Sequence, residues 1–115
     1  KVETDVKTTY KWFVSKPINN YNVSVNIANY AVIADTIHSV TGIQPATYYV
    51  LDYNEAVARE HFKEARDMMR SLEKFFGPFP WWEDGYKLVE TPYLGMEHQT
   101  AVAYGNDFRI YDKSK

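Results

Sequence analysis

The sequence contains no cysteine, and this absence excludes two kinds of small domain at once. A scaffold held together by disulfide bonds cannot form, and no metal ion can be bound by thiolates. The compartment stays open, because reducing and oxidising surroundings both suit a chain without thiols. A cytosolic origin and a periplasmic or secreted origin are therefore equally consistent with the sequence.

Long apolar runs and a strong charge of one sign are also missing. No stretch is long enough to span a bilayer, and no N-terminal signal peptide is visible, so we expect a soluble chain with no membrane span. The net charge is −2, and acidic and basic residues are interspersed. A surface that binds nucleic acid is therefore not expected.

The 115 residues are enough for one ordinary domain or for pieces of two. The chain begins with Lys1 and stops in a polar run at residues 112–115, and from both ends we expect a segment of a longer protein. No internal repeat or low-complexity tract divides it. A change of hydrophobic period near residue 54 is the one candidate domain boundary.

Several catalytic motifs are absent. The zinc-binding pattern His-Glu-x-x-His does not occur, and none of the three His residues has a partner at zinc-ligand spacing. There is also no Gly-rich phosphate loop and no serine nucleophile elbow. We therefore expect no metal site, no resident cofactor and no catalytic residue within this chain.

Aromatic residues, by contrast, are abundant: they make up 17% of the chain, with ten Tyr and three Trp. Such a density occurs in the cores of β-sheets and on surfaces that bind sugars or peptides. One alternative interpretation is therefore a non-catalytic, aromatic-rich β module that binds carbohydrate or peptide. The amphipathic helix expected in the middle of the chain argues against it.

The first half of the chain has the period of β-strands. Between residues 21 and 27, Tyr, Val and Ile alternate with Asn and Ser, which predicts a strand with one wet face. Apolar residues 31–34 continue the pattern after a bend. Residues 10–14 and 47–53 predict two further strands, and a loop is expected at residues 42–45.

At residue 54 the period changes to that of a helix, and we expect one helix over residues 54–76. Asn54 is a suitable N-cap, and Gly77 followed by Pro78 predicts the helix end. Six apolar residues recur at steps of four and three, which places them on one buried face. They are Ala58, Phe62, Ala65, Met69, Leu72 and Phe76.

After the helix, residues 79–85 are expected to form turns with bulky aromatic anchors. Residues 86–91 predict a strand, residues 94–99 an extended segment and residues 100–104 another strand. The predicted fold class is thus α+β, with an antiparallel β segment, then an amphipathic helix, then further β-strands.

The most informative run is Leu94-Gly95-Met96-Glu97-His98-Gln99, which places a carboxylate between a Met and two polar side chains. It resembles the Gly-x-Met-Glu-Asn exopeptidase signature of the zinc aminopeptidases of the gluzincin group, the M-one peptidase family of alanyl and leucyl aminopeptidases. Leu94 and His98 depart from that signature. The form with His98 and Gln99 looks like a variant of some bacterial members.

The resemblance extends over the segments before the motif. The run from Phe75 to Trp81 and the strand after it follow the order seen at the start of the family's thermolysin-like catalytic domain. The β-rich half is similar to the end of the saddle-shaped β domain that precedes it. The resemblance therefore implies two pieces: the C-terminal part of an N-terminal β domain in residues 1–53, and the N-terminal part of a thermolysin-like catalytic domain in residues 54–115.

The resemblance also implies substrate-binding roles. Glu97 would hold the free α-ammonium group of a peptide, and Gly95, Met96 and His98 would form the same substrate-binding segment. A carboxylate in a partly dry groove makes a charge-assisted hydrogen bond with a cation, and it disfavours internal peptide segments, which have none. Gly95 would let a ligand backbone approach closely, and Met96 is expected to anchor the segment in the core.

In the complete enzyme, the resemblance implies zinc as the cofactor and a zinc-activated water that attacks the first peptide bond. The zinc ligands would lie in the rest of the catalytic domain, so the chain alone should be inactive. Its partners would be that remaining domain and a peptide with a free N-terminus, and a dimer of the fragment through the helix face is an alternative. A further alternative is an interaction domain with the family's shape but without its chemistry.

Overall fold

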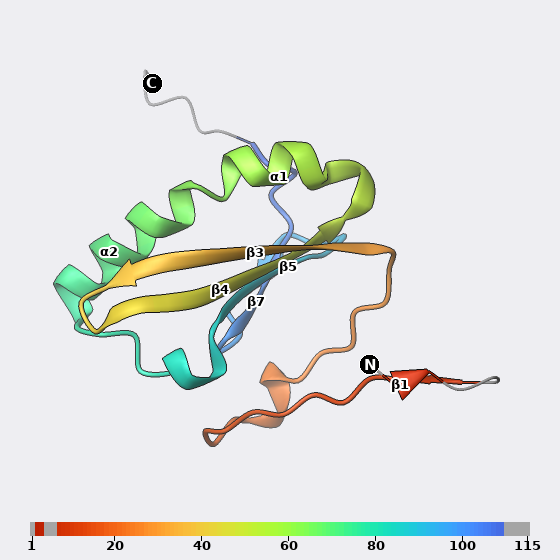
Figure 1. The fold of residues 1–115 in the computed structure, drawn as a ribbon, viewed down its shortest axis with the longest axis horizontal. Helices are drawn as coiled ribbons and strands as arrows, with labels where there is room; N and C mark the ends of the chain where they lie inside the picture. Colours follow the sequence, from red (N-terminus) through yellow and green to blue (C-terminus); the bar gives the residue numbers. More distant parts are fainter. Residues whose placement is uncertain (1, 4–6, 110–115) are drawn as a thin grey trace.

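A five-stranded mixed sheet carries two helices on one of its faces (Figure 1). The computed structural model describes residues 2–3 and 7–109, so Lys1 and the polar run at residues 112–115 lie outside the described residues. This arrangement confirms the predicted α+β class. No helix in the described part of the chain is long and apolar enough to cross a membrane.

The strands of the central sheet have the order β3-β4-β5-β7-β6. A hairpin joins β3 (Tyr30–Ser39) to β4 (Gly42–Leu51), and the two strands pair antiparallel along their whole length. β5 (Tyr86–Glu90) lies parallel to β4, and β7 (Ala101–Tyr104) lies parallel to β5. The short β6 (Gly95–Met96) pairs antiparallel with β7.

The prediction of antiparallel pairing is therefore right only in part. Parallel strands need a crossover connection, and the helices between β4 and β5 supply it. The domain boundary expected after residue 53 falls within this crossover, and strands from both sides of it form one sheet. The division of residues 1–53 and 54–115 into two domains stays a prediction.

The loop expected at residues 42–45 is wrong, because these residues belong to β4. Proline lacks the N–H that a central strand needs, but pairing between β4 and β5 begins only at Ala46. Pro45 lies one residue before that stretch and faces Thr36 of β3. No hydrogen bond from residue 45 to β5 is therefore required.

Two helices take the place of the single predicted one: α1 (Glu55–His61) and α2 (Glu64–Phe76). Between them the Ala65 N–H bonds the Phe62 carbonyl at 3.0 Å, a tighter turn than that of an α-helix. This turn lets the Phe62 ring enter an aromatic cluster, with its centroid 4.9 Å from that of Tyr48 and 5.0 Å from that of Tyr104. The break in the helix accompanies the deepest aromatic contact of the core.

The predicted helix end at Gly77 is confirmed, and the predicted N-cap hydrogen bond of Asn54 is absent. Gly77, with φ of 86°, ends α2 as expected. Asn54 precedes α1, but its side chain makes no cap hydrogen bond. It donates instead to Glu90 Oε1 at 2.6 Å, while Glu90 Oε2 accepts the Leu51 N–H at 2.8 Å. The Asn54 side chain therefore ties the start of α1 to β5.

The buried face of the helices is confirmed for Ala58, Phe62, Ala65 and Met69. It is wrong for Leu72 and Phe76, which are 44% and 82% exposed. In the last turns of α2 the buried position is Glu73, whose carboxylate reaches the tip of the β3–β4 hairpin. The helical spacing of the apolar residues continues beyond the part of α2 that the strands of the sheet cover.

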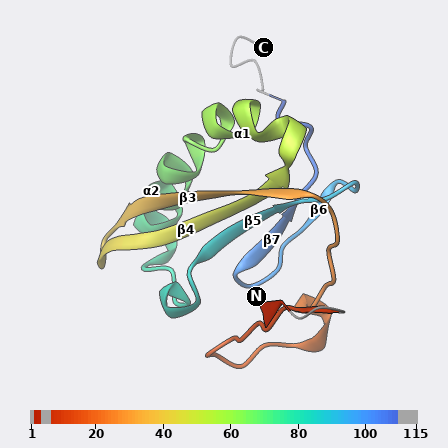
Figure 2. The same ribbon diagram turned by 45° about the vertical axis from the view of Figure 1, so that its right-hand side comes forward.

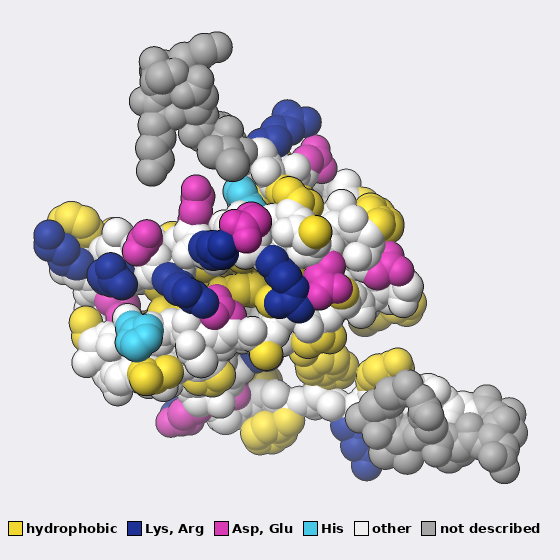
Figure 3. All heavy atoms as spheres, turned by 45° about the horizontal axis from the view of Figure 1, so that its top comes forward, with side chains coloured by type: hydrophobic (Ala, Val, Ile, Leu, Met, Phe, Trp, Pro, Cys, Tyr) yellow, Lys and Arg dark blue, Asp and Glu magenta, His cyan; other side chains and the backbone are white. Residues whose placement is uncertain are grey.

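The outer face of the helices is charged, with basic and acidic side chains interspersed (Figure 3). Several of them pair along the helix, including Arg59 with Glu55 and Lys63 with Glu60. No broad region of one sign is visible on this face. The core below it includes alternating residues from β3 and β4, such as Ile33, Ile37, Tyr48 and Val50.

The N-terminal segment lies on the opposite side of the sheet from the helices (Figures 1 and 2). It contains the two-residue strands β1 (Val2–Glu3) and β2 (Thr8–Thr9) and the 3-10 turn η1 (Asn20–Asn22). Two further 3-10 turns, η2 (Asp52–Asn54) and η3 (Trp82–Asp84), flank the helices.

The strands predicted at residues 10–14 and 21–27 are wrong, since neither range forms a strand. Val23, Val25 and Ile27, the alternating apolar residues, are 67%, 84% and 91% exposed. Alternating apolar residues form a buried strand face only when a partner strand covers them. The described residues offer no partner strand there. The apolar segment is therefore left open on the surface.

Candidate functional site

The motif strand β6 lies at the edge of the five-stranded sheet. Gly95 pairs with Tyr104 and Met96 with Ala103, both in β7, and no described strand covers the other side of β6. An open edge offers N–H and C=O groups to an added strand or an extended peptide. The extended, edge-strand interpretation of residues 94–99 is thus confirmed for Gly95 and Met96.

Gly95 is required by the close approach of the two strands. Its φ is 130°, a conformation that other residues rarely adopt, and an added Cβ would lie 2.7 Å from the Ala103 carbonyl oxygen. A second close contact occurs at Gly105, where an added Cβ would lie 1.5 Å from the Tyr93 carbonyl oxygen. The two glycines hold the β6–β7 hairpin tight beneath the motif.

Glu97 follows β6 directly, and its carboxylate is exposed. It makes no hydrogen bond or ion pair with any described residue, whereas most other carboxylates near the sheet are paired. Its neighbours differ in burial. His98 is only 7% exposed, while Met96 is 39% exposed, so the expected anchoring of Met96 in the core is wrong. His98 is the residue of the motif that packs inward.

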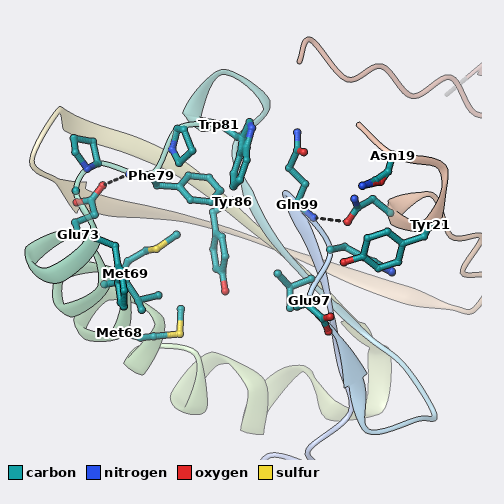
Figure 4. A pocket seen from close by; sticks show the side chains of 18 residues that line it. Asn19, Tyr21, Met68, Met69, Glu73, Phe79, Trp81, Tyr86, Glu97 and Gln99 are labelled. Carbon is teal, nitrogen blue, oxygen red and sulfur yellow. Dashed lines mark hydrogen bonds between the residues drawn. The ribbon is translucent and has the colours of Figure 1, made fainter. Parts of the chain in front are cut away.

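Glu97 lines a groove of about 570 Å³ that lies between α2 on one side and the motif and η1 on the other. Figure 4 shows Met68, Met69 and Glu73 on one wall, Glu97 and Gln99 on the other, and Tyr86 between them. No Lys or Arg is found among the described residues that line it. The groove is mainly apolar, and its lining includes Leu72, Phe76, Phe79, Trp81 and Val102.

Burial and hydrogen bonds shift the pKa of two titratable side chains in the groove. Burial raises the pKa of Tyr86 to about 12. Burial alone would also raise the pKa of Glu73, but four hydrogen bonds outweigh it and leave this pKa below its ordinary value. The donors are the Ser39 hydroxyl, the Val40 and Phe79 N–H groups and the Trp82 indole. Glu73 is therefore a satisfied structural carboxylate, and Glu97 is the one with free acceptor oxygens.

The N-terminal segment contacts the motif from outside the sheet. The Gln99 N–H donates to Asn22 Oδ1 at 3.0 Å, and the Tyr21 ring lies edge-on to His98 with centroids 6.2 Å apart. Sequence reasoning missed both residues, because it placed them on a strand of their own. A contact across 77 positions leaves no local pattern that would reveal it.

The three His residues lie in different places. His98 packs below the motif, His61 shares a hydrogen bond of 2.8 Å with the Tyr104 hydroxyl, and His38 is exposed on β3. In the described part of the chain, no group of three His, Asp or Glu side chains could hold a metal ion. These residues do not fit a zinc ion, and we assign no reaction step to a metal in this chain.

Comparison with known proteins adds no assignment. No protein-family model matches the sequence, and no curated protein matches it either.

Proposed function

We propose that this chain is the part of a zinc-dependent aminopeptidase that receives the free amino end of a peptide. The observation that carries the proposal is the environment of Glu97, an unpaired carboxylate at the end of an open edge strand. It lies at the rim of a groove in which no described Lys or Arg competes for it. A ligand ammonium group is the partner that such a carboxylate lacks.

The edge strand and the carboxylate divide the work of recognition. The outer edge of Gly95 and Met96 bonds the backbone of an extended peptide whatever its side chains are. Glu97 accepts hydrogen bonds from the α-ammonium group, and this charge-assisted contact selects the first residue of the peptide. An internal segment brings no cation, so its binding would desolvate Glu97 without compensation. The site therefore recognises the amino end of the substrate.

The larger assembly is part of the same proposal. The order of helices, strand and motif strand in residues 54–115 supports the start of a thermolysin-like catalytic domain, and residues 1–53, which include the β3–β4 hairpin, would contain the end of a preceding β domain. Zinc and its ligands would come from the remainder of that catalytic domain, which is also the main partner of this chain. The chain alone is expected to be inactive. The direct test is the effect of Glu97→Gln on substrates with free and with blocked amino ends.

A second candidate function is an aromatic-rich binding module for carbohydrate or peptide. One observation favours it: a groove of about 520 Å³ on the far face of the sheet is lined by Trp12, Phe13, Tyr30 and Tyr49. Trp12 and Phe13 are 72% and 90% exposed, as stacking platforms for sugars would be. Binding in a glycan screen that is lost with Trp12→Ala but kept with Glu97→Gln would support this candidate over the first.

A further inference from the structure

The position of Glu97 is determined by its neighbours, because its own side chain has no contact that would hold it. On its N-terminal side, Met96 pairs with Ala103 in β7. On its C-terminal side, the chain leaves the sheet, and the His98 N–H bonds the Met96 carbonyl at 2.9 Å. This tight turn holds Glu97 at its apex. A separate contact is needed to fix the residues that follow Glu97.

The contact that does so comes from η1. Asn22 Oδ1 accepts the Gln99 N–H at 3.0 Å, and Asn22 lines the same groove as Glu97. Tyr21 adds an edge-on contact with the buried His98 ring. Two successive residues of η1 thus contact the two residues that follow Glu97.

We propose that Asn22 is a positioning residue for Glu97 and that Tyr21 assists it. Asn22 fixes the backbone at Gln99, so the turn that carries Glu97 keeps its carboxylate at the groove. This inference rests on the proposed function of Glu97. It adds that a segment far away in the sequence, on the other side of the predicted domain boundary, sets the affinity for the amino end of the substrate.

The expected effect is on binding more than on rate. Without Asn22 the Glu97 carboxylate samples several positions, and only a part of them meets the ammonium group, so KM for a free-amine substrate rises. A single hydrogen bond of this kind corresponds to about a fivefold change. A blocked substrate never uses Glu97, and its kinetics should stay unchanged.

The test uses the full natural protein that contains this chain, with Asn22→Ala, Asn22→Asp and Asn20→Ala. Asp keeps an acceptor oxygen for the Gln99 N–H, and Asn20 is an exposed residue of the same turn and serves as the control. The first readout is hydrogen–deuterium exchange in peptides that cover Gln99. Exchange should become faster in Asn22→Ala, return toward wild type in Asn22→Asp and stay unchanged in Asn20→Ala. Unchanged exchange in Asn22→Ala would overturn the proposal.

The second readout is a double-mutant cycle with leucyl anilide and its N-acetylated form. Asn22→Ala should raise KM for the free amine about fivefold in the wild-type background and leave it unchanged in the Glu97→Gln background. Equal effects in both backgrounds would show that Asn22 acts only on the general structure, and the inference would fail while the proposed function stood. If Glu97→Gln itself left the free-amine substrate untouched, the proposed function would fail, and the positioning role with it.

Discussion

The Trp82 indole N–H donates to the Glu73 carboxylate at 3.2 Å, inside a core where Glu73 is only 5% exposed. The same carboxylate binds the tip of the β3–β4 hairpin through Ser39 and Val40. Glu73 therefore joins the end of α2, the hairpin and the loop before β5 at one wall of the groove. The shape of the groove opposite Glu97 depends on this charged residue.

Glu73→Ala should lower the free energy of unfolding by about 2–4 kcal/mol, because it leaves several buried donors without an acceptor. Urea denaturation followed by circular dichroism measures the change. Glu64→Ala, an exposed glutamate at the start of the same helix, is the control and should stay within about 0.5 kcal/mol of wild type. Equal losses in the two variants would contradict the role assigned to Glu73.

Acid should weaken the fold through the same residue. Burial pushes the pKa of Glu73 up, but the hydrogen bonds prevail and hold it below its ordinary value of 4.5. The stabilisation is thus fully present above about pH 5 and is lost as the pH falls through the folded-state pKa. The difference in unfolding free energy between wild type and Glu73→Gln should shrink from about pH 7 to about pH 3. A difference that stays constant over this range would argue against it.

Gly95→Ala should destabilise the β6–β7 hairpin through a clash as well as backbone strain. Gly42 offers a matched comparison, since its φ is 116° but an added Cβ would meet nothing within 4 Å. Gly42→Ala should show only the strain, roughly 1–3 kcal/mol, and Gly95→Ala should cost more because the Ala103 carbonyl must move. Thermal unfolding of both variants gives the comparison, and a larger loss at Gly42 would refute the steric argument.

The open end of α2 should promote self-association of the isolated chain. Phe76 is 82% exposed and lines the groove, while Phe75 is 75% exposed and does not. Light scattering of the wild-type chain should therefore detect a dimer at high concentration, and Phe76→Gln should weaken it more than Phe75→Gln does. A wild-type chain that stays monomeric would exclude this dimer.

The sequence predicted those features whose cause is local or whose partner is the sheet. The helix face at Ala58 and Met69 and the helix end at Gly77 follow from spacing and from glycine chemistry, and the structure confirms them. The predicted burial of Leu72 is wrong because the helical period does not reveal where the covering sheet ends. The strand predicted around Ile27 is wrong because alternation of apolar and polar residues produces a strand only where a partner strand is present.

In the candidate site, too, the features with a local cause were predicted and those with a distant partner were not. The edge position of Gly95 agrees with the extended segment that the motif suggested. The contact between Asn22 and Gln99 could not be predicted, because it depends on how the chain returns to the sheet after 77 positions. Met96 was expected inside since it is apolar, but an edge strand of two residues has an outer side that nothing in the described chain covers.

The central claim, that Glu97 receives the amino end of a peptide, is tested most directly by Glu97→Gln in the complete aminopeptidase that we propose. The substitution keeps the size and shape of the side chain and removes its charge. kcat/KM for leucyl anilide should fall at least on the order of tenfold, since a charge-assisted contact with the ammonium group is lost. kcat/KM for N-acetyl-leucyl anilide should stay about as low as before. An unchanged kcat/KM for the free-amine substrate would show that Glu97 is an ordinary carboxylate beside an edge strand.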